Sequence, residues 1–370
     1  MDIPFIDLQY QYRQYQEEID AQIREVLDSS GYILGEKVEG IEAELARFCG
    51  VRHAIGVGSG TEALQLALMA LGVGPGDEVI TTPFTFIATA EVISLLRATP
   101  VFVDVREDTW NIDPDQVEEA ITEDTAAVIA VDLFGQCADY ERLAAICSEH
   151  GISLIEDAAQ GFGAVRNGRR AGSFGEIACT SFYPAKPLGC YGDGGMVFTE
   201  SDVFDEEIRS LRVHGEGAGR YQHVRVGMNA RLDAIQAAVL LAKFEAFPSE
   251  IEARRRVARR YTEKLESMVE RTPTIRPGNQ SVWAQYCVEI PYRDAVREKL
   301  NEADVPTAVF YPLPLHLQDA YRDLGYNWGD LPVCEAASRR IIALPMHPYL
   351  DEETQDYIIE QLDAALAQVS

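Results

Sequence analysis

Short, nearly continuous apolar runs alternate with stretches of helical periodicity over the first two thirds of the chain. Helical patterns separate the apolar runs, which lie at residues 53–59, 77–82, 100–105, 126–135 and 152–159. Strands of a parallel sheet have this composition when helices cover both faces of the sheet. The alternation therefore predicts an α/β fold with a mostly parallel sheet sandwiched by helices, and a helical segment at 17–31 precedes it.

The pattern changes near residue 245. A long helical stretch from 231 to 247 meets Pro248 and then resumes, and a break follows at Pro277-Gly278. Shorter strand and helix patterns complete the chain, which indicates a smaller α+β unit. We therefore expect a large domain of residues 1–245 and a small C-terminal domain of residues 246–370.

The composition disfavours several classes of protein. The chain has 60 acidic and 32 basic residues, a formal charge of −28, whereas a nucleic-acid partner requires a basic face. No apolar run approaches the roughly 18 residues of a membrane span, and the N-terminus does not resemble a secretory signal. The seven cysteines are scattered and form no CxxC pair, so we expect reduced thiols, no metal site and a cytoplasmic location.

Four segments stand where predicted strands end, which is where open parallel sheets bind ligands. In the first, GVGSGTEAL, a glycine-rich turn leads from a strand into a helix. Gly60 and Thr61 could offer backbone amides and a hydroxyl to a phosphate at that helix N-terminus. An ordinary tight turn has the same signature. The spacing of Gly56, Gly58 and Thr61 also half resembles a dinucleotide fingerprint, although the next strand ends without the acidic residue of such a site.

The second and third segments supply an aromatic ring and a carboxylate. Phe84 and Phe86 follow a strand and a proline, and either could lie flat against a ligand ring or belong to the core. Asp157 ends an apolar strand, and Gln160 follows it by three residues. The carboxylate could cap the next turn or bind a heterocyclic NH⁺.

The fourth segment contains Lys186, one of only five lysines in the chain. It follows the mostly apolar run EIACTSFYP and precedes a glycine-rich turn. Lysines usually lie on the surface, but in a dry interior the pKa of the amine falls and the amine becomes a nucleophile toward aldehydes. Ser181, five residues earlier, could offer another hydroxyl to a phosphate.

Together these parts match one cofactor. Pyridoxal 5'-phosphate needs a phosphate cradle, an aromatic ring that stacks on it, a carboxylate for its pyridinium nitrogen and a lysine for its aldehyde. Each part occurs once, in a separate connection between predicted elements. The sequence therefore predicts a pyridoxal phosphate enzyme.

Four motifs carry a resemblance to a known family: GSGTEAL, EDAAQGFGA, SFYPAKPLGCYGDGG and VGMNARLDAIQAA. They resemble the fold-type-I sugar aminotransferases of the DegT/DnrJ/StrS group, and the resemblance extends over essentially the whole chain. It implies that Lys186 joins covalently to the cofactor aldehyde. It also implies that Asp157 pairs with the pyridine nitrogen, Gln160 with the ring hydroxyl, and Phe86 with the face of the ring.

The same resemblance implies a shared active site. The phosphate ligands that it implies are Gly60, Thr61, Ser181 and, from a neighbouring subunit, Asn229. A homodimer follows from the position of Asn229. The expected amino donor is L-glutamate, and the expected acceptor is a keto-sugar joined to a nucleotide.

Several segments are most similar to one branch of the family, whose members aminate C3 of UDP-2-acetamido-2-deoxy-3-keto-glucuronate for surface-polysaccharide precursors. These segments are RYQHVRVGMNARLD, SVWAQYCVEI, VPTAVFYPLPLHLQ and ALPMHPYLD. That branch usually has His where this chain has Phe310, and PLHLQ is more similar to enzymes that act on dTDP-3-keto-6-deoxyhexoses. Arg231 could meet the sugar carboxylate in place of that His or only start a helix. Tyr311 and His316 could contact the sugar or serve packing.

Three other functions fit part of the pattern. A C3-dehydratase of the same family is expected to have His in place of Lys186. A non-catalytic regulator that binds the cofactor or a nucleotide sugar is expected to lack some cofactor residues, and all of them are present here. An NAD-dependent enzyme could use the turn at Gly56, and the colour of the purified protein would distinguish it, because bound NAD⁺ does not absorb visible light.

Overall fold

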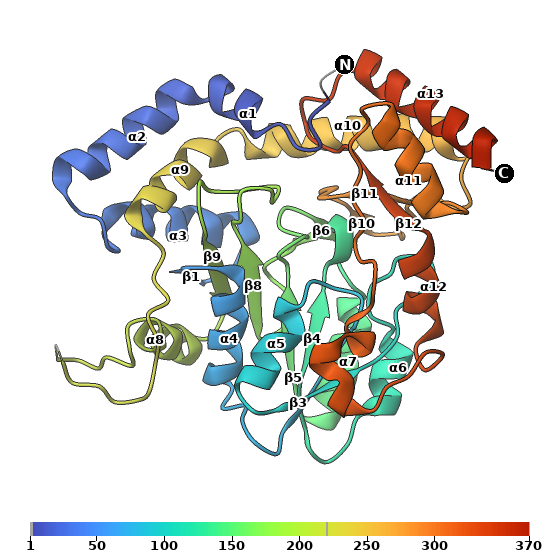
Figure 1. Cartoon of the computed structure of the whole chain (residues 1–370). Coiled ribbons are helices and arrows are strands. Elements are labelled where there is room, and N and C mark those ends of the chain that lie inside the picture. The colour runs from blue at the N-terminus through green and yellow to red at the C-terminus, as the bar shows by residue number, and fades with distance from the viewer. Residues whose placement is uncertain (1–2, 220, 370) are drawn as a thin grey trace.

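A seven-stranded sheet forms the centre of the larger part of the computed structural model (Figure 1), which describes residues 3–219 and 221–369. The strand order is β1-β9-β8-β5-β4-β2-β3. These strands are β1 His53–Val57, β2 Glu78–Thr81, β3 Thr99–Phe102, β4 Thr125–Val131, β5 Ser153–Asp157, β8 Ile177–Ser181 and β9 Gly195–Thr199. All neighbouring pairs are parallel except those of β9 with β1 and β8. The predicted α/β fold with a mostly parallel sheet is confirmed.

Helices cover both faces of this sheet. One face packs on α3 Glu36–Cys49, α6 Pro114–Ala120, α7 Tyr140–His150 and α9 Ala234–Phe244. The other face packs on α4 Gly60–Ala70, α5 Ala88–Leu95 and α8 Asp202–Leu211. Along β4, Val128 and Ala130 belong to the first cluster, and Ala127 and Ile129 belong to the second. Burial on both faces explains why the strands read as unbroken apolar runs.

The antiparallel strand β9 is a feature that the sequence pattern did not reveal. The strand is only five residues long and comes directly after a glycine-rich turn that begins at Gly192. Its few apolar residues therefore show too short a pattern to be recognised as a strand. Ser181 at the end of β8 is the pairing partner of Gly195 at the start of β9. Residues 182–194, which include Lys186, therefore leave and rejoin the sheet at the same edge.

The C-terminal part has its own apolar core and a two-stranded sheet. This core involves α10 Phe247–Leu265, β11 Tyr286–Glu289, α11 Arg293–Glu302, β12 Ile341–Leu344 and α13 Glu352–Val369. Residues of α12 Pro332–Arg340 instead share a buried cluster with Phe84 and Phe102 of the central sheet region. The helix break at 245–246 coincides with the expected boundary, which stays a prediction because the two parts share this cluster.

The remaining α-helices and strands are short or lie at the N-terminus. They are α1 Leu8–Gln14, α2 Gln16–Ser29, β6 Val165–Arg166, β7 Arg169–Arg170 and β10 Asn279–Gln280. Within the described ranges, no helix combines the length and the apolar character that crossing a membrane requires. All seven cysteines are buried and free. The same ranges contain no group of three or more His, Cys, Asp or Glu side chains that could hold a metal ion.

The outer edge of β1 is closed by charged side chains. Glu42 of α3 accepts hydrogen bonds from the Gly56 N–H and from Arg212, both at 2.7 Å. Arg212 also donates to the Gly56 carbonyl at 2.7 Å, and Arg209 donates to Glu42 at 2.9 Å. Glu42 and Arg212 are buried. This network satisfies the backbone of an edge strand just before it reaches the turn at Gly58 and Ser59.

We expect the change Glu42→Ala to lower the free energy of unfolding by about 3 to 5 kcal/mol, because it leaves Arg212 buried without its partner. Glu44→Ala on the same helix is the matched control. Glu44 pairs with Arg47 at 2.7 Å, but both side chains are exposed, so its loss should cost about 1 kcal/mol or less. Urea unfolding measures both. Equal unfolding midpoints for the two variants would contradict a buried network at this edge.

Candidate active site

The turn after β1 and the end of β8 meet at the carboxyl edge of the sheet. Ser59 caps α4, and its hydroxyl accepts a hydrogen bond from the Glu62 N–H at 3.1 Å. A Cβ atom placed on Gly60 would lie 2.7 Å from the Cβ of Ser181, so only glycine allows this approach. Thr61 stands in the first turn of the same helix. The amides of α4 and the hydroxyl of Ser181 thus surround one point, where a phosphate fits the positive end of the helix.

The structure distinguishes the environments of Phe84 and Phe86, two phenylalanines in the loop after β2 that the sequence could not assign to the core or to a ligand site. Phe84 is fully buried, and its ring meets those of Phe134 and Tyr311 edge-on. Phe86 is 57% exposed although it lies in a loop that otherwise packs tightly. Phe84 is therefore a core residue, and Phe86 presents the ring that is free to stack on a ligand.

Asp157 ends β5 as a buried carboxylate without a cationic partner in contact. The Thr89 hydroxyl donates to its Oδ2 at 2.9 Å, and the Ala159 N–H donates to its Oδ1 at 3.1 Å. Burial raises the pKa of Asp157, and these two hydrogen bonds and the charge of Lys186 oppose that rise. Among the described residues, no salt bridge reaches Asp157. A buried carboxylate in this state favours a bound cation.

Lys186 lies in the excursion between β8 and β9, where its N–H donates to the Tyr183 carbonyl at 2.8 Å. Its amine forms no hydrogen bond or ion pair with any residue that the structure describes. Desolvation lowers the pKa of Lys186, and the charge of Asp157 opposes that shift. Both residues therefore act on one another across the site. An amine in this environment is a stronger nucleophile at neutral pH than a surface lysine.

A buried lysine, Lys243, packs against the same excursion. Lys243 of α9 donates to the carbonyl of Gly189, and burial lowers its pKa to about 8. Its charge also interacts with Glu250 and Cys190. The amine of Lys243 is thus hydrogen-bonded and holds the loop that carries Lys186, whereas the amine of Lys186 has no hydrogen bond to a described residue.

Gln160 connects the central sheet to the C-terminal part. Its Oε1 accepts from the Phe134 N–H at 3.0 Å, and its Nε2 donates to the Tyr311 hydroxyl at 3.1 Å. Burial raises the pKa of Tyr311, and the charge of Asp157 adds to that rise. The predicted site residues Asp157, Gln160 and Tyr311 are therefore neighbours.

Asn229, Arg231 and His316 are not joined to this group by any contact. Asn229 is exposed and bridges to Val213. Arg231 bridges to Val57 at the end of β1, and its half-buried guanidinium has no partner among the described residues. His316 is buried with its Nε2 3.3 Å from Glu335, and desolvation lowers its pKa. That placement suits the packing role of His316, whose contact with a sugar stays a prediction.

Two contributors to the site were not identified from the sequence. Thr89 bonds the carboxylate of Asp157, and the backbone of Phe134 bonds Gln160. A threonine within the otherwise apolar helix pattern after Phe86 is a usable signal for the first. The second is a backbone donor in a turn, and no residue type marks it.

The donors present fit pyridoxal phosphate. Gly60 and Ser181 leave room beside a helix N-terminus, Asp157 has no cationic contact, Lys186 has an unbonded amine, and Phe86 shows an open ring. Each matches a different part of the cofactor. The fit depends on where the fold places these groups, since they come from the ends of four separate strands, β1, β2, β5 and β8.

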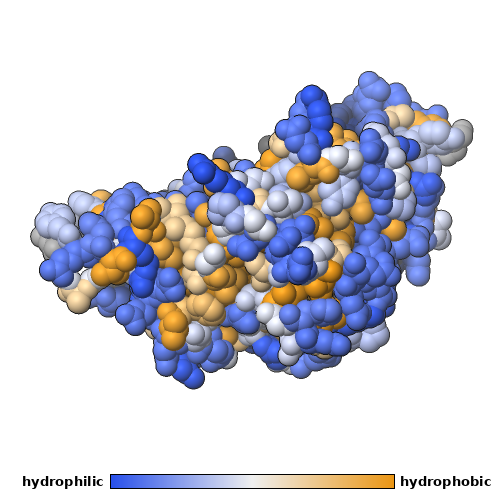
Figure 2. Space-filling view, turned by 90° about the horizontal axis from the view of Figure 1, so that it is seen from below, coloured by the Kyte–Doolittle hydropathy of each residue, from blue (hydrophilic) through white to orange (hydrophobic). Residues whose placement is uncertain are grey.

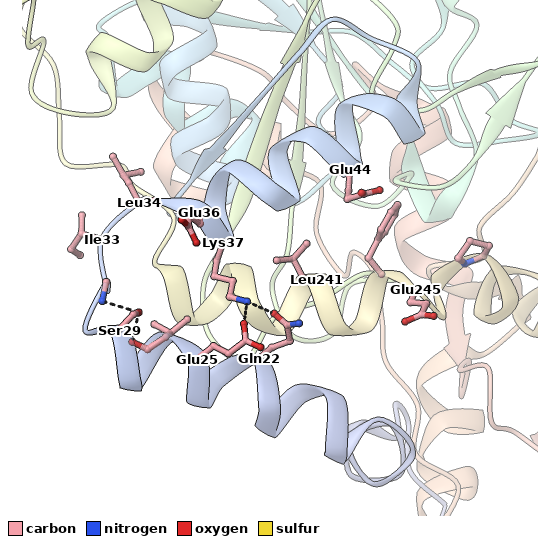
Figure 3. A pocket seen from close by; sticks show the side chains of 15 residues that line it. Gln22, Glu25, Ser29, Ile33, Leu34, Glu36, Lys37, Glu44, Leu241 and Glu245 are labelled. Carbon is pink, nitrogen blue, oxygen red and sulfur yellow. Dashed lines mark hydrogen bonds and ion pairs between the residues drawn. The ribbon is translucent and has the colours of Figure 1, made fainter.

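A hollow of about 900 Å³ lies apart from these residues, between α2, α3 and α9 (Figure 3). Lys37 points into it and donates to Gln22 at 2.6 Å, beside Glu25. None of the predicted cofactor residues lines it. The size of a hollow therefore does not locate the chemistry in this protein.

Comparisons with known proteins show the family to which the chain belongs. Residues 13–363 match the model of the DegT/DnrJ/EryC1/StrS aminotransferase family. A relative from Pseudomonas aeruginosa, named UDP-2-acetamido-2-deoxy-3-oxo-D-glucuronate aminotransferase, is 50% identical and covers 94% of this chain and 96% of its own. One from Geobacillus stearothermophilus, named pleiotropic regulatory protein, is 48% identical over 98% of both chains. A crystal structure of a family aminotransferase from Brucella abortus is 45% identical, with a TM-score of 0.95 over 98% of this chain and 99% of that chain.

Proposed function

Because the chain belongs to the DegT/DnrJ/EryC1/StrS aminotransferase family, we propose that it transfers the amino group of L-glutamate to C3 of UDP-2-acetamido-2-deoxy-3-keto-glucuronate. The class of enzyme follows from the family, whose members are sugar aminotransferases that depend on pyridoxal phosphate. The observation that carries the choice of sugar is the 50% identity to the Pseudomonas aeruginosa enzyme over nearly the full length of both chains.

Bound pyridoxal phosphate supplies an aldehyde that accepts amines and a ring that takes up electrons from the substrate carbon. We assign the residues around it by their chemistry. The amides of Gly60 and Thr61 and the Ser181 hydroxyl hold the phosphate, and the carboxylate of Asp157 keeps the ring nitrogen protonated. Phe86 covers the ring, and Gln160 bonds the ring hydroxyl.

Lys186 is the proposed proton carrier of the reaction. Its amine lies in the same site as Asp157, and burial lowers its pKa, which favours the unprotonated amine relative to a surface lysine. The free amine would carry the proton between the substrate carbon and the cofactor carbon, as general base and then as general acid. Its lack of a fixed hydrogen bond allows it to move between these two positions.

Arg231 is the proposed partner of the sugar carboxylate. The position where the glucuronate branch usually has His is Phe310 here, and Phe310 packs near Phe5 and Tyr311. Arg231 lies at the end of β1, beside the phosphate cradle, and is half-buried without a partner among the residues that the structure describes, although the chain has many carboxylates. A planar guanidinium suits two-point contact with a carboxylate. Tyr311 is a candidate contact for the sugar hydroxyls.

We also propose a homodimer that shares its active sites, in the cytoplasm. The segment between α8 and α9 extends away from the rest of the chain (Figure 1), and it exposes Val224 and Val226 as well as Asn229. Apolar side chains gather in the middle of the face seen in Figure 2, with hydrophilic ones around them. Exposed apolar groups of this kind are typical of subunit contacts, and Asn229 would then reach the phosphate of the partner's site.

The proposal is tested with glutamate and a panel of acceptors: the UDP-3-keto-glucuronate, its C6-hydroxymethyl analogue, a dTDP-3-keto-6-deoxyhexose and a 4-keto sugar. We expect the highest kcat/KM for the glucuronate, and a loss of about tenfold or more for that substrate in Arg231→Leu, equivalent to about 1.4 kcal/mol. The analogue without the carboxylate should lose little in this variant.

Other outcomes would redirect the proposal. Preference for the dTDP sugar would favour the deoxyhexose reaction, which the PLHLQ segment resembles. Amination of the 4-keto sugar alone would overturn the assignment of C3. No turnover of any acceptor, with the cofactor bound, would favour the regulatory role that the name of the Geobacillus stearothermophilus relative suggests.

A further inference from the structure

Two carboxylates are buried directly behind the residues that face the cofactor. Asp132 follows β4, and Glu156 precedes Asp157 on β5; both are 0% exposed. Their side chains lie within hydrogen-bonding reach of each other. Because successive side chains of a strand point to opposite faces, Glu156 and Asp157 point to different sides of the sheet. The mechanism proposed above uses neither Asp132 nor Glu156.

The hydrogen bonds around the pair leave one oxygen without a donor. Asp132 Oδ1 accepts from the Ala138 N–H at 3.0 Å and from the Tyr140 hydroxyl at 2.8 Å. The two oxygens of Glu156 accept from the N–H groups of Gly172 and Phe174, each at 2.8 Å. Asp132 Oδ2 is buried with no such partner. A proton on Glu156 completes the set, because a carboxylic acid can donate to that oxygen.

The surroundings of the pair also favour a bound proton. Burial raises the pKa of both carboxyl groups, and the hydrogen bond between them raises that of Glu156 further while it lowers that of Asp132, so Glu156 holds the proton. The other titratable groups that act on the pair or are acted on by it are Cys49, Cys137, Tyr140, Asp157 and Cys179. The cations that act on the surrounding thiols are Arg166 and Arg170, and Arg166 is already paired with Asp139 and Glu141. Two negative charges at this position would repel one another.

Asp132 contacts Asp157 directly and is linked to Gln160 through the turn that contains Phe134. Its N–H donates to the Asp157 carbonyl at 3.0 Å. It begins the turn in which the Phe134 N–H holds Gln160. A Cβ atom placed on Gly161 would lie 2.3 Å from the Cβ of Asp132, so the chain after Gln160 packs directly against this side chain. A movement of Asp132 therefore moves the supports of Asp157 and Gln160 together.

We propose that Asp132 and Glu156 form an acid–carboxylate pair that shares one proton and positions Asp157 and Gln160 for the cofactor. Both are positioning residues, and the inference rests on the roles proposed above for Asp157 and Gln160. With its proton the pair carries one negative charge and holds the turn in place. When the proton leaves at high pH, two charges face each other in a buried site, and the turn shifts.

The two amide variants of the pair have different expected effects. In Asp132→Asn, the amide oxygen keeps the bonds from Ala138 and Tyr140, and the amide nitrogen donates to an ionised Glu156, so no hydrogen bond is lost. In Glu156→Gln, the nitrogen would face the N–H of Gly172 or Phe174, which leaves that donor unpaired. Asp132→Asn should therefore fold as well as the wild type, and Glu156→Gln should unfold at a lower temperature.

The shared proton is tested by the pH dependence of unfolding of the cofactor-free protein. The pKa values of the pair are raised in the folded state, so the wild type loses stability as pH rises from the unfolded values, about 4, toward the folded ones. Asp132→Asn removes one of the two carboxyl groups, so over this window the folded variant binds one proton fewer than the wild type. The ratio of its folding equilibrium constant to that of the wild type should therefore rise by about tenfold per pH unit over that window. If the difference in stability between the wild type and Asp132→Asn did not change with pH, the shared proton would be ruled out. This result does not depend on whether the cofactor binds.

The positioning role has its own measurement, the affinity for pyridoxal phosphate from absorbance titrations. As pH rises through the raised pKa values of the pair, affinity should fall for the wild type relative to Asp132→Asn, because only the wild-type pair then gains a second negative charge. An affinity ratio that stays constant with pH, while the stability ratio changes, would overturn the positioning of Asp157 and Gln160. If the wild type bound no cofactor at any pH of this range, the result would instead contradict the proposed function.

Discussion

Replacing Lys186 with alanine is expected to lower kcat by at least about a thousandfold, because no other described side chain in the site has an unbonded amine that can carry the proton. The variant should still fold, since the amine makes no hydrogen bond or ion pair that the fold depends on. Removing a half-buried, unbonded charge should leave the midpoint of thermal unfolding of the cofactor-free protein unchanged or slightly higher. Steady-state turnover with glutamate and a keto-sugar measures the loss.

Lys264→Ala is the matched control for this change. Lys264 forms a surface pair with Asp356 at 2.6 Å, so its removal should change kcat by less than about twofold and stability only slightly. Borohydride reduction followed by peptide mapping adds a direct readout, and it should label the peptide with Lys186 in the wild type and the control. Turnover of Lys186→Ala near the wild-type rate, or labelling of Lys243, would remove Lys186 from its role.

The sequence determined the fold class because the strands are buried on both faces and therefore read as apolar runs. The same rule did not reveal β9, since a five-residue strand after a glycine-rich turn has too little pattern of its own. The candidate residues could be named because they stand where strands end, and ligands bind at that edge of a parallel sheet. Periodicity could not separate Phe84 from Phe86, as both follow the same strand and only packing exposes one of them.

Contacts between segments that are distant in the chain could not be predicted from the sequence. Thr89 holds Asp157 and Tyr311 holds Gln160, across 68 and 151 residues of chain. His316 illustrates the opposite case, because its residue type suggests a sugar contact while packing places it against Glu335. A polar residue shows what it can do chemically. Only its surroundings show whether the fold leaves that chemistry free.

Changing Asp157 to asparagine is expected to lower kcat by at least about a hundredfold while it stabilises the cofactor-free protein. The loss arises because a neutral amide cannot keep the ring nitrogen protonated. The gain arises because the buried carboxylate has only neutral groups in contact with it. The Thr89 hydroxyl can turn to accept from the new amide and donate to Thr85, 3.1 Å away, so no hydrogen bond is lost.

The size of the stability gain depends on pH. The pKa of Asp157 is raised in the folded state, so the wild-type carboxylate costs stability as pH rises above its unfolded value of about 3.9. The advantage of Asp157→Asn should therefore grow from acid to neutral pH. Asp351→Asn is the control of opposite sign, because the N–H of Thr354 lowers the pKa of Asp351, and loss of that charge should destabilise the protein without changing kcat. If Asp157→Asn instead lowered the unfolding temperature of the cofactor-free protein, the carboxylate of Asp157 would stabilise the empty site as a structural capping residue. Burial of an unpaired charge could then not explain why the site favours a pyridinium cation.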